Sequence, residues 1–180
     1  MNNRDPIAET THWDALLKEH RPGVFRLAYL LLGDCDDAED VTQETFIRAY
    51  RAIDTFDSSR EMRPWLLRIA TNLARNKRRS VARFIAALQR WVWAESSLMQ
   101  PQSIENKADE NLRAQRLWQA VQRLPQGDQE IIYLRHFLEV SEGEASTVLG
   151  VALGTVKSRT HRALKKLRDV IERNFPDLKE

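Results

Sequence analysis

Turn-forming residues are rare along most of this chain, and their rarity is what most constrains its fold. Only six glycines and six prolines occur in 180 residues. Between them lie long stretches in which apolar residues recur every three or four positions, the spacing that places them along one face of an α-helix. The sequence therefore predicts an all-α fold.

The periodic segments form two blocks, which predict two small helical domains joined by a linker. In the first block, residues 11–93, we expect helices from about Thr11, from about 36 to 53, and from Pro64 to Arg79 or beyond. Thr11 and Asp14 have capping-box spacing. Residues 94–111 lose the period and contain Pro101, so they are predicted to be a linker.

The second block, residues 112–175, is predicted to be a helix-turn-helix domain. Ser141 and Glu144 have capping-box spacing and should begin a short helix, which Gly150 ends. A further helix should begin near Leu153. A short helix, a tight turn and a basic second helix form the pattern in which the second helix enters the DNA major groove.

Composition excludes several classes of protein. The single cysteine, Cys35, allows no internal disulfide framework and no cysteine zinc cluster, and it fits a reducing compartment. The four histidines have no metal-ligand spacing, and no phosphate loop or nucleophile motif is present. No apolar run reaches the roughly 18 residues of a membrane span. We therefore expect a cytoplasmic protein that is not an enzyme, has no metal or cofactor, and does not insert into membranes.

The net charge of the chain is only +2, so any electrostatic function must come from local segregation of charge. The segment from Asp34 to Glu44 carries six acids and no base. On the predicted helix, Ile47 projects into this acidic face and Tyr50 lies at its edge. An apolar centre with a charged rim is typical of a protein–protein contact. Acids near a helix N-terminus are also favoured by the helix dipole, which does not explain Ile47.

Two other predicted helices carry basic faces. Between Arg60 and Arg90 there are nine cations and one acid, and a face with threonine and asparagine among arginines suits a single nucleic-acid strand. Its residues are Arg68, Thr71, Asn72, Arg75, Arg78 and Arg79, with Lys77 nearby. On the last helix, Lys157, Ser158, His161 and Arg162 share one surface, and their side chains can bind base edges and phosphates. Val156, Ala163, Leu164 and Leu167 should form its apolar side.

These segments together resemble the bacterial RNA polymerase sigma factors of the sigma-70 family, specifically the two-domain extracytoplasmic-function (ECF) class. "DDAEDVTQETF" is similar to the D-x-A-E-D-x-x-Q-E-x-F helix of that class, and "WLLRIATNLARNKRR" to its W-L-x-R-I-A-x-N-x-x-x-N-x-x-R helix. "LGVALGTVKSRTHRALKKL" resembles its C-terminal DNA-binding helices. The resemblance covers roughly residues 11–80 and 112–170.

The resemblance implies a transcription initiation factor with three contact surfaces. The acidic helix would bind the clamp of the largest subunit of core RNA polymerase through Asp37, Glu39, Asp40, Gln43, Glu44, Ile47 and Tyr50. The helix that begins at Pro64 and the 54–63 loop before it would open the minus-ten element of promoter DNA, with contacts from Arg68, Thr71, Asn72, Arg75, Lys77 and Arg78. The last helix would read the minus-thirty-five element through Thr155, Lys157, Ser158, Arg159, His161 and Arg162.

The family also implies an inhibitor, an anti-sigma factor, which we expect to contact both domains. Trp91 and Trp93 make the linker start unusually aromatic and are candidate contacts. Two departures from the family pattern weaken the helix-turn-helix prediction. Gly143 and Ala145 replace larger residues, and Ala152 stands where a proline is usual. Glycine costs a helix roughly 1 kcal/mol relative to alanine.

Two alternatives remain open from the sequence. A stand-alone helix-turn-helix regulator would use the first block for dimerisation or sensing, and would bind duplex DNA tightly without polymerase. A sigma-like decoy would bind anti-sigma factors and have lost DNA binding, which the basic residues on both helices argue against.

Overall fold

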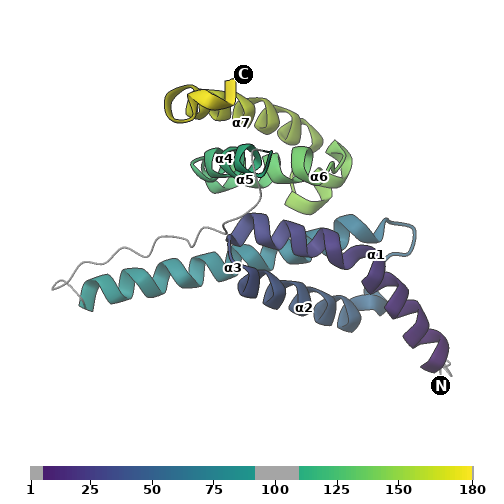
Figure 1. Ribbon diagram of the computed structural model, residues 1–180. Helices are drawn as coiled ribbons and strands as arrows, with labels where there is room; N and C mark the ends of the chain where they lie inside the picture. Colours follow the sequence, from purple (N-terminus) through teal and green to yellow (C-terminus); the bar gives the residue numbers. More distant parts are fainter. Residues whose placement is uncertain (1–5, 92–109, 180) are drawn as a thin grey trace. The chain divides into compact units, whose positions relative to one another are not determined.

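The structure is a computed structural model that describes the backbone of residues 6–91 and 110–179, and the side chains of residues 13–83 and 112–178. Every regular element in these ranges is a helix, which confirms the all-α prediction (Figure 1). The chain divides into two compact units between Ala86 and Ala87. The predicted linker lies mostly at residues 92–109, outside the described residues, so the predicted domain limits stay predictions.

The first unit contains α1 (Pro6–Leu32), α2 (Cys35–Ala52), the short 3-10 helix η1 (Ile53–Thr55) and α3 (Met62–Trp91). Helix α1 already runs through Thr11, so the predicted start there was wrong. Pro22 lies inside α1, where it removes a backbone donor, and Figure 1 shows α1 as two segments that meet at an angle. Helix α3 continues twelve residues past Arg79, to Trp91.

The core of the first unit is built from one side of each helix. Fully buried leucines stabilise the fold by about 1.5–3 kcal/mol each. The buried residues are Leu16, Val24, Leu27, Ala28, Leu30 and Leu31 of α1, Ala38, Val41, Thr42, Thr45, Phe46 and Ala49 of α2, and Leu66, Leu67, Ala70, Thr71 and Ala74 of α3.

The second unit contains α4 (Glu110–Gln122), α5 (Gln126–Ile132), a π-helical turn η2 (Tyr133–Phe137), α6 (Glu142–Leu149), α7 (Leu153–Asn174) and the short η3 (Pro176–Lys179). Helix α7 contacts α4, α5 and η3. Val156, Ala163 and Leu167 of α7 are buried, as predicted, but Leu164 is 41% exposed, so its placement in the apolar side was wrong.

Candidate interaction surfaces

Helix α2 begins at a cap that uses one of its acids for structure. The Asp34 side chain accepts a hydrogen bond from the backbone N–H of Asp37 at 2.8 Å, which satisfies a donor that the first helical turn leaves open. Asp36 and Asp37 lie in that first turn, where the helix dipole favours negative charge. The acids that follow, from Glu39 to Glu44, lie beyond the first turn, so neither the cap nor the helix dipole accounts for them.

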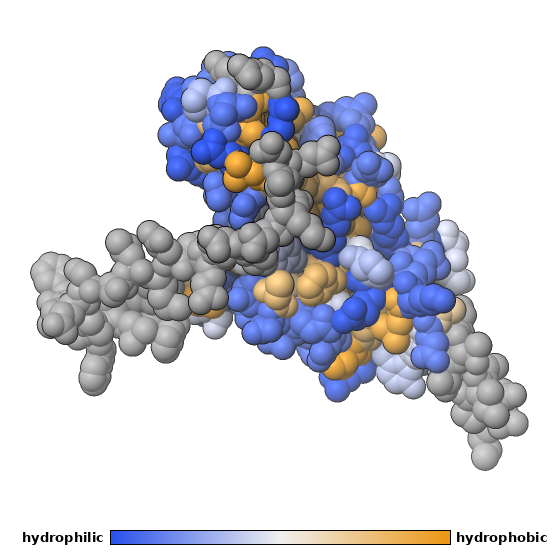
Figure 2. Space-filling view, viewed as in Figure 1, coloured by the Kyte–Doolittle hydropathy of each residue, from blue (hydrophilic) through white to orange (hydrophobic). Residues whose placement is uncertain are grey.

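The seven residues predicted to bind polymerase lie on the accessible side of α2. Asp40, Gln43, Ile47 and Tyr50 are exposed, and the other three, Asp37, Glu39 and Glu44, are half-buried. Ile47 is 44% exposed and Tyr50 is 53% exposed, so two large side chains with apolar surface lie one turn apart among the acids. Figure 2 shows a surface that is largely hydrophilic, with separate hydrophobic patches.

Three cations offset part of the negative charge of this face through ion pairs that were not predicted, and one of them is Lys77, which was predicted to contact DNA. Arg21 of α1 pairs with Glu39 at 2.5 Å, and Arg48 pairs with Glu44 at 2.7 Å. Lys77 of α3 pairs with Asp37 at 2.7 Å and with Asp40 at 2.9 Å. Only the Arg48 pair could be read from the sequence, because Glu44 and Arg48 have i, i+4 spacing.

An aromatic side chain from α1 extends the apolar part of this surface. The ring of Trp13 lies 5.4 Å from the ring of Tyr50, tilted by 36°, within the range of favourable aromatic pairs. Ile47 lies one turn before Tyr50 on α2. No sequence pattern predicts the contact of Trp13 with Tyr50, because it depends on how α1 packs against α2.

The basic face of α3 is narrower than predicted. Arg68 and Asn72 are exposed, and Arg75 Nη1 donates to Asn72 Oδ1 at 3.4 Å. Thr71 is only 1% exposed and its hydroxyl donates to the Leu67 carbonyl at 2.7 Å. Its predicted place on the exposed face was wrong, since Thr71 lies at the edge of the arc that packs in the core.

Lys77 also lies away from the basic face. It follows Arg68 by nine residues, and at 3.6 residues per turn this spacing places it on the opposite side of the helix. Its ammonium group contacts acids of α2 instead. Arg78 is half-buried, and its predicted contact with DNA stays a prediction.

The loop between α2 and α3 is held by local contacts. The Phe56 and Trp65 rings lie 4.7 Å apart. Asp57 accepts hydrogen bonds from the Ser59 backbone at 3.1 Å, the Ser59 hydroxyl at 2.6 Å and Arg60 Nε at 3.1 Å. The hydrogen bonds from Ser59 lower the pKa of Asp57, because they favour its charged form. These contacts hold the loop in a defined conformation at the start of α3.

Both ends of α6 have the predicted features, a capping box at its start and a glycine at the turn before α7. Ser141 Oγ accepts from the Glu144 backbone N–H at 3.2 Å, and Glu144 accepts from the Ser141 backbone N–H at 2.7 Å, so the capping box is confirmed. Gly150 ends α6 with a φ of 67°, a left-handed conformation that favours glycine. The Ser146 hydroxyl donates to the Val151 carbonyl at 2.6 Å and fixes the turn.

Helix α7 presents a continuous basic surface. Four of the six residues predicted to read duplex DNA are exposed, namely Lys157, Ser158, His161 and Arg162. Thr155 and Arg159 are half-buried, and a Cβ added at Gly127 of α5 would lie 3.8 Å from Arg159 Nη1, so this guanidinium turns back toward α5. Lys165 and Arg168 lie on the exposed basic face and extend it by three turns from Lys157.

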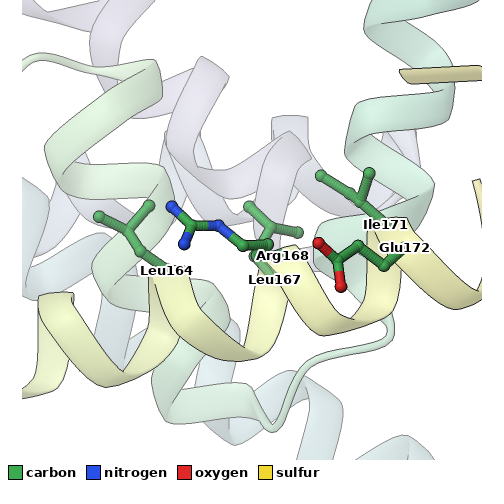
Figure 3. A pocket seen from close by; sticks show the side chains of 5 residues that line it. All are labelled: Leu164, Leu167, Arg168, Ile171 and Glu172. Atoms are coloured by element: carbon green, nitrogen blue, oxygen red, sulfur yellow. The ribbon is translucent and has the colours of Figure 1, made fainter. Parts of the chain in front are cut away.

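Other charges of α7 hold the second unit together. Lys166 pairs at 2.6 Å with Asp128 of α5, whose side chain is 12% exposed. Farther along α7, Leu164, Leu167, Arg168, Ile171 and Glu172 line a shallow groove (Figure 3). Its apolar side chains do not belong to the basic surface.

No three histidine, cysteine, aspartate or glutamate side chains gather as metal ligands would in the part of the chain that the structure describes. None of the helices in the described ranges combines the length and the apolar character that crossing a membrane requires.

Sequence comparisons identify the family. The pattern of Sigma-70 region 2 matches residues 16–84, and the pattern of Sigma-70, region 4 matches residues 114–167. The ECF RNA polymerase sigma factor SigW from Bacillus subtilis is 32% identical over 155 residues, which cover 83% of each chain. The chain is an ECF sigma factor of the sigma-70 family.

Two further relatives match about nine tenths of this sigma factor, but the match covers different shares of their own lengths. SigL from Mycobacterium tuberculosis is 34% identical over 162 residues, which cover 89% of each chain. SigE from Mycolicibacterium smegmatis is 37% identical over 164 residues, and there the match covers 90% of this chain and 62% of SigE.

Two solved structures have a similar fold to this sigma factor. The sigma factor RpoE from Bartonella quintana, in complex with the anti-sigma factor NepR, is 25% identical with a TM-score of 0.70, over 91% of this chain and 98% of that one. CnrH, in complex with the cytosolic domain of CnrY, is 26% identical with a TM-score of 0.68, over 92% of this chain and 90% of that one.

Proposed function

We propose that this sigma factor binds core RNA polymerase through α2, opens the minus-ten element with α3, and reads the minus-thirty-five element with α7. The observation that carries the proposal is the exposed pair Ile47 and Tyr50 within a rim of charged residues on α2. In a stand-alone regulator this surface would have to be a dimerisation or sensing contact. Catalysis belongs to the polymerase, and the sigma factor directs it in the cytoplasm.

On the proposed polymerase surface, binding energy should come mainly from the apolar centre. Because Glu39, Glu44, Asp37 and Asp40 already have cationic partners within the chain, they add less attraction for a basic partner than six unpaired acids would. Because Ile47 is 44% exposed in the free chain, burying the rest of it would contribute about 0.7–1.3 kcal/mol, roughly that fraction of the value for a fully exposed side chain. The charged rim then sets the orientation and the rate of docking.

The two basic faces would bind DNA in different forms, α3 an opened single strand and α7 a duplex. On α3, Arg68, Asn72 and Arg75 form a short face suited to an opened strand, beside the loop that Phe56 and Trp65 anchor. On α7, Lys157 and the exposed residues one turn away present donors to base edges and phosphates of a duplex, as in other helix-turn-helix proteins.

The proposal extends to an inhibitor. One structural neighbour, RpoE, is a sigma factor bound to the anti-sigma factor NepR, and another, CnrH, is bound to the cytosolic domain of CnrY. We propose that this chain is likewise held inactive by an anti-sigma factor. The candidate contacts Trp91 and Trp93 lie outside the described side chains. Unchanged affinity for an anti-sigma factor after Trp91→Ala and Trp93→Ala would refute their role.

Run-off transcription with bacterial core polymerase over a library of upstream sequences tests the function. We expect initiation from a defined promoter set with the wild-type chain and none with Asp40→Ala/Ile47→Asp. Leu112→Asp is a matched control, since Leu112 is 54% exposed on α4, outside the three surfaces, and should leave initiation unchanged. Tight duplex binding by the chain alone, with no added initiation, would favour the stand-alone regulator.

A further inference from the structure

Lys77 occupies an unusual position on α3. Its ammonium group lies between two carboxylates of α2, 2.7 Å from Asp37 Oδ1 and 2.9 Å from Asp40 Oδ2. Its side chain is only 28% exposed. It is thus a cation of the DNA-facing helix that is turned toward the proposed polymerase-docking helix.

The contact has a clear electrostatic role in the free chain. Asp37 and Asp40 are three positions apart on α2, so their charges face the same way and repel each other. Burial by itself would lower the pKa of Lys77, but its hydrogen bonds to Asp37 and Asp40 outweigh burial and raise it. The ammonium group therefore stays charged and offsets the repulsion.

We propose that Lys77 is the internal counter-ion of the docking surface, a positioning residue that competes with cations of core polymerase for Asp37 and Asp40. This inference rests on the proposed function of α2. Asp40 is 71% exposed on its side chain and can be reached by a partner, whereas Asp37 is 37% exposed and lies closer to Lys77. A polymerase cation must share these carboxylates with Lys77 or replace it. The internal ion pairs of Lys77 therefore reduce the net electrostatic attraction between the carboxylates and the polymerase.

The test is a double-mutant cycle on the full chain, with affinity for core polymerase measured at low and at high salt. Lys77→Met keeps the apolar stem and removes the charge. We expect it to tighten binding about two- to fivefold at low salt, the range that an exposed ion pair contributes. The gain should shrink at high salt, which screens the freed carboxylates. It should vanish in the Asp37→Asn/Asp40→Asn background.

Three controls separate this role from others. Lys77→Arg should bind core polymerase as the wild type does, because it keeps the charge. Arg83→Met removes another exposed cation of α3, one outside the docking surface, and should leave the affinity unchanged. Thermal unfolding shows whether each variant folds, and Lys77→Gln replaces Lys77→Met if the latter does not.

The outcomes distinguish the two proposals. If Asp37→Asn/Asp40→Asn binds core polymerase as tightly as the wild type, docking through these carboxylates is wrong and the role of Lys77 falls with it. If that variant binds weakly but Lys77→Met binds no tighter than the wild type, only the counter-ion role is overturned. It is also overturned if Lys77→Met leaves core affinity unchanged and weakens holoenzyme binding to a minus-ten single strand, since Lys77 would then be a promoter contact.

Discussion

Helix α6, which precedes α7, offers a sharp test, because replacing glycine by alanine should act in opposite directions at Gly143, near its start, and at Gly150, at its end. Gly150 ends α6 with a φ of 67°. Alanine is strained in that conformation by about 1–2 kcal/mol. Gly143 lies in the first turn of α6 without positive φ, and an added Cβ would meet only Ser141 Oγ at 4.0 Å, an ordinary contact.

We therefore expect Gly150→Ala to destabilise the second unit by about 1–2 kcal/mol, and Gly143→Ala to stabilise it by about 0.5 kcal/mol, since a first-turn glycine costs less than an interior one. In a domain of this size, 1 kcal/mol shifts Tm by about 4–8 °C. Gly150→Ala should also weaken binding to duplex promoter DNA, because it disturbs the turn before α7, whereas Gly143→Ala should not.

The measurement is urea and thermal unfolding of the full chain followed by circular dichroism, with duplex affinity measured on the same samples. Shifts of both variants in the same direction would refute the reasoning from backbone conformation. Equal stability of Gly150→Ala and the wild type would show that the turn does not need a left-handed residue.

Three further predictions follow from individual contacts. Ser141→Ala should lower the free energy of unfolding by about 1 kcal/mol by urea denaturation, because it removes the acceptor for the Glu144 backbone N–H; an unchanged midpoint would contradict the capping role. Lys157→Ala should weaken duplex binding by the holoenzyme and reduce its salt slope by about one, and an unchanged slope would mean that Lys157 makes no phosphate contact. Burial and then Arg135 lower the pKa of His136 from its ordinary 6.5. The unfolded chain then binds more protons, so Tm should fall as pH drops below about that value. The imidazole is covered only in part, so the effect is modest, and a pH profile that His136→Gln does not flatten would refute this reasoning.

Two predictions that rested on local chemistry, both at α6, were confirmed by the structure. The Ser141 capping box and the Gly150 helix end were both readable, because each depends on residues a few positions apart. The break before α2 was readable for the same reason, since Asp34 caps that helix from its own neighbourhood. The predicted start at Thr11 failed because capping-box spacing also occurs inside helices, and α1 begins earlier, at Pro6.

Helical faces were predicted less well than helices. Thr71 was placed among exposed arginines, but the buried arc of α3 is wide enough to include it. Leu164 was placed in the apolar side of α7 and is 41% exposed. The period of the hydrophobic residues shows which side of a helix faces the core. The width of that buried side depends on how many neighbouring helices pack against the helix.

The sequence by itself determined the all-α class, the helix-turn-helix chemistry and the family, because these depend on residue type, period and the order of motifs. Only the tertiary structure decided the electrostatics of α2. Arg21 and Lys77 are 18 and 37 positions from the acids they contact, and no local pattern brings them there. Packing of α1 and α3 against α2 does so, and Coulomb attraction over a few ångströms then offsets part of the negative charge around the apolar centre.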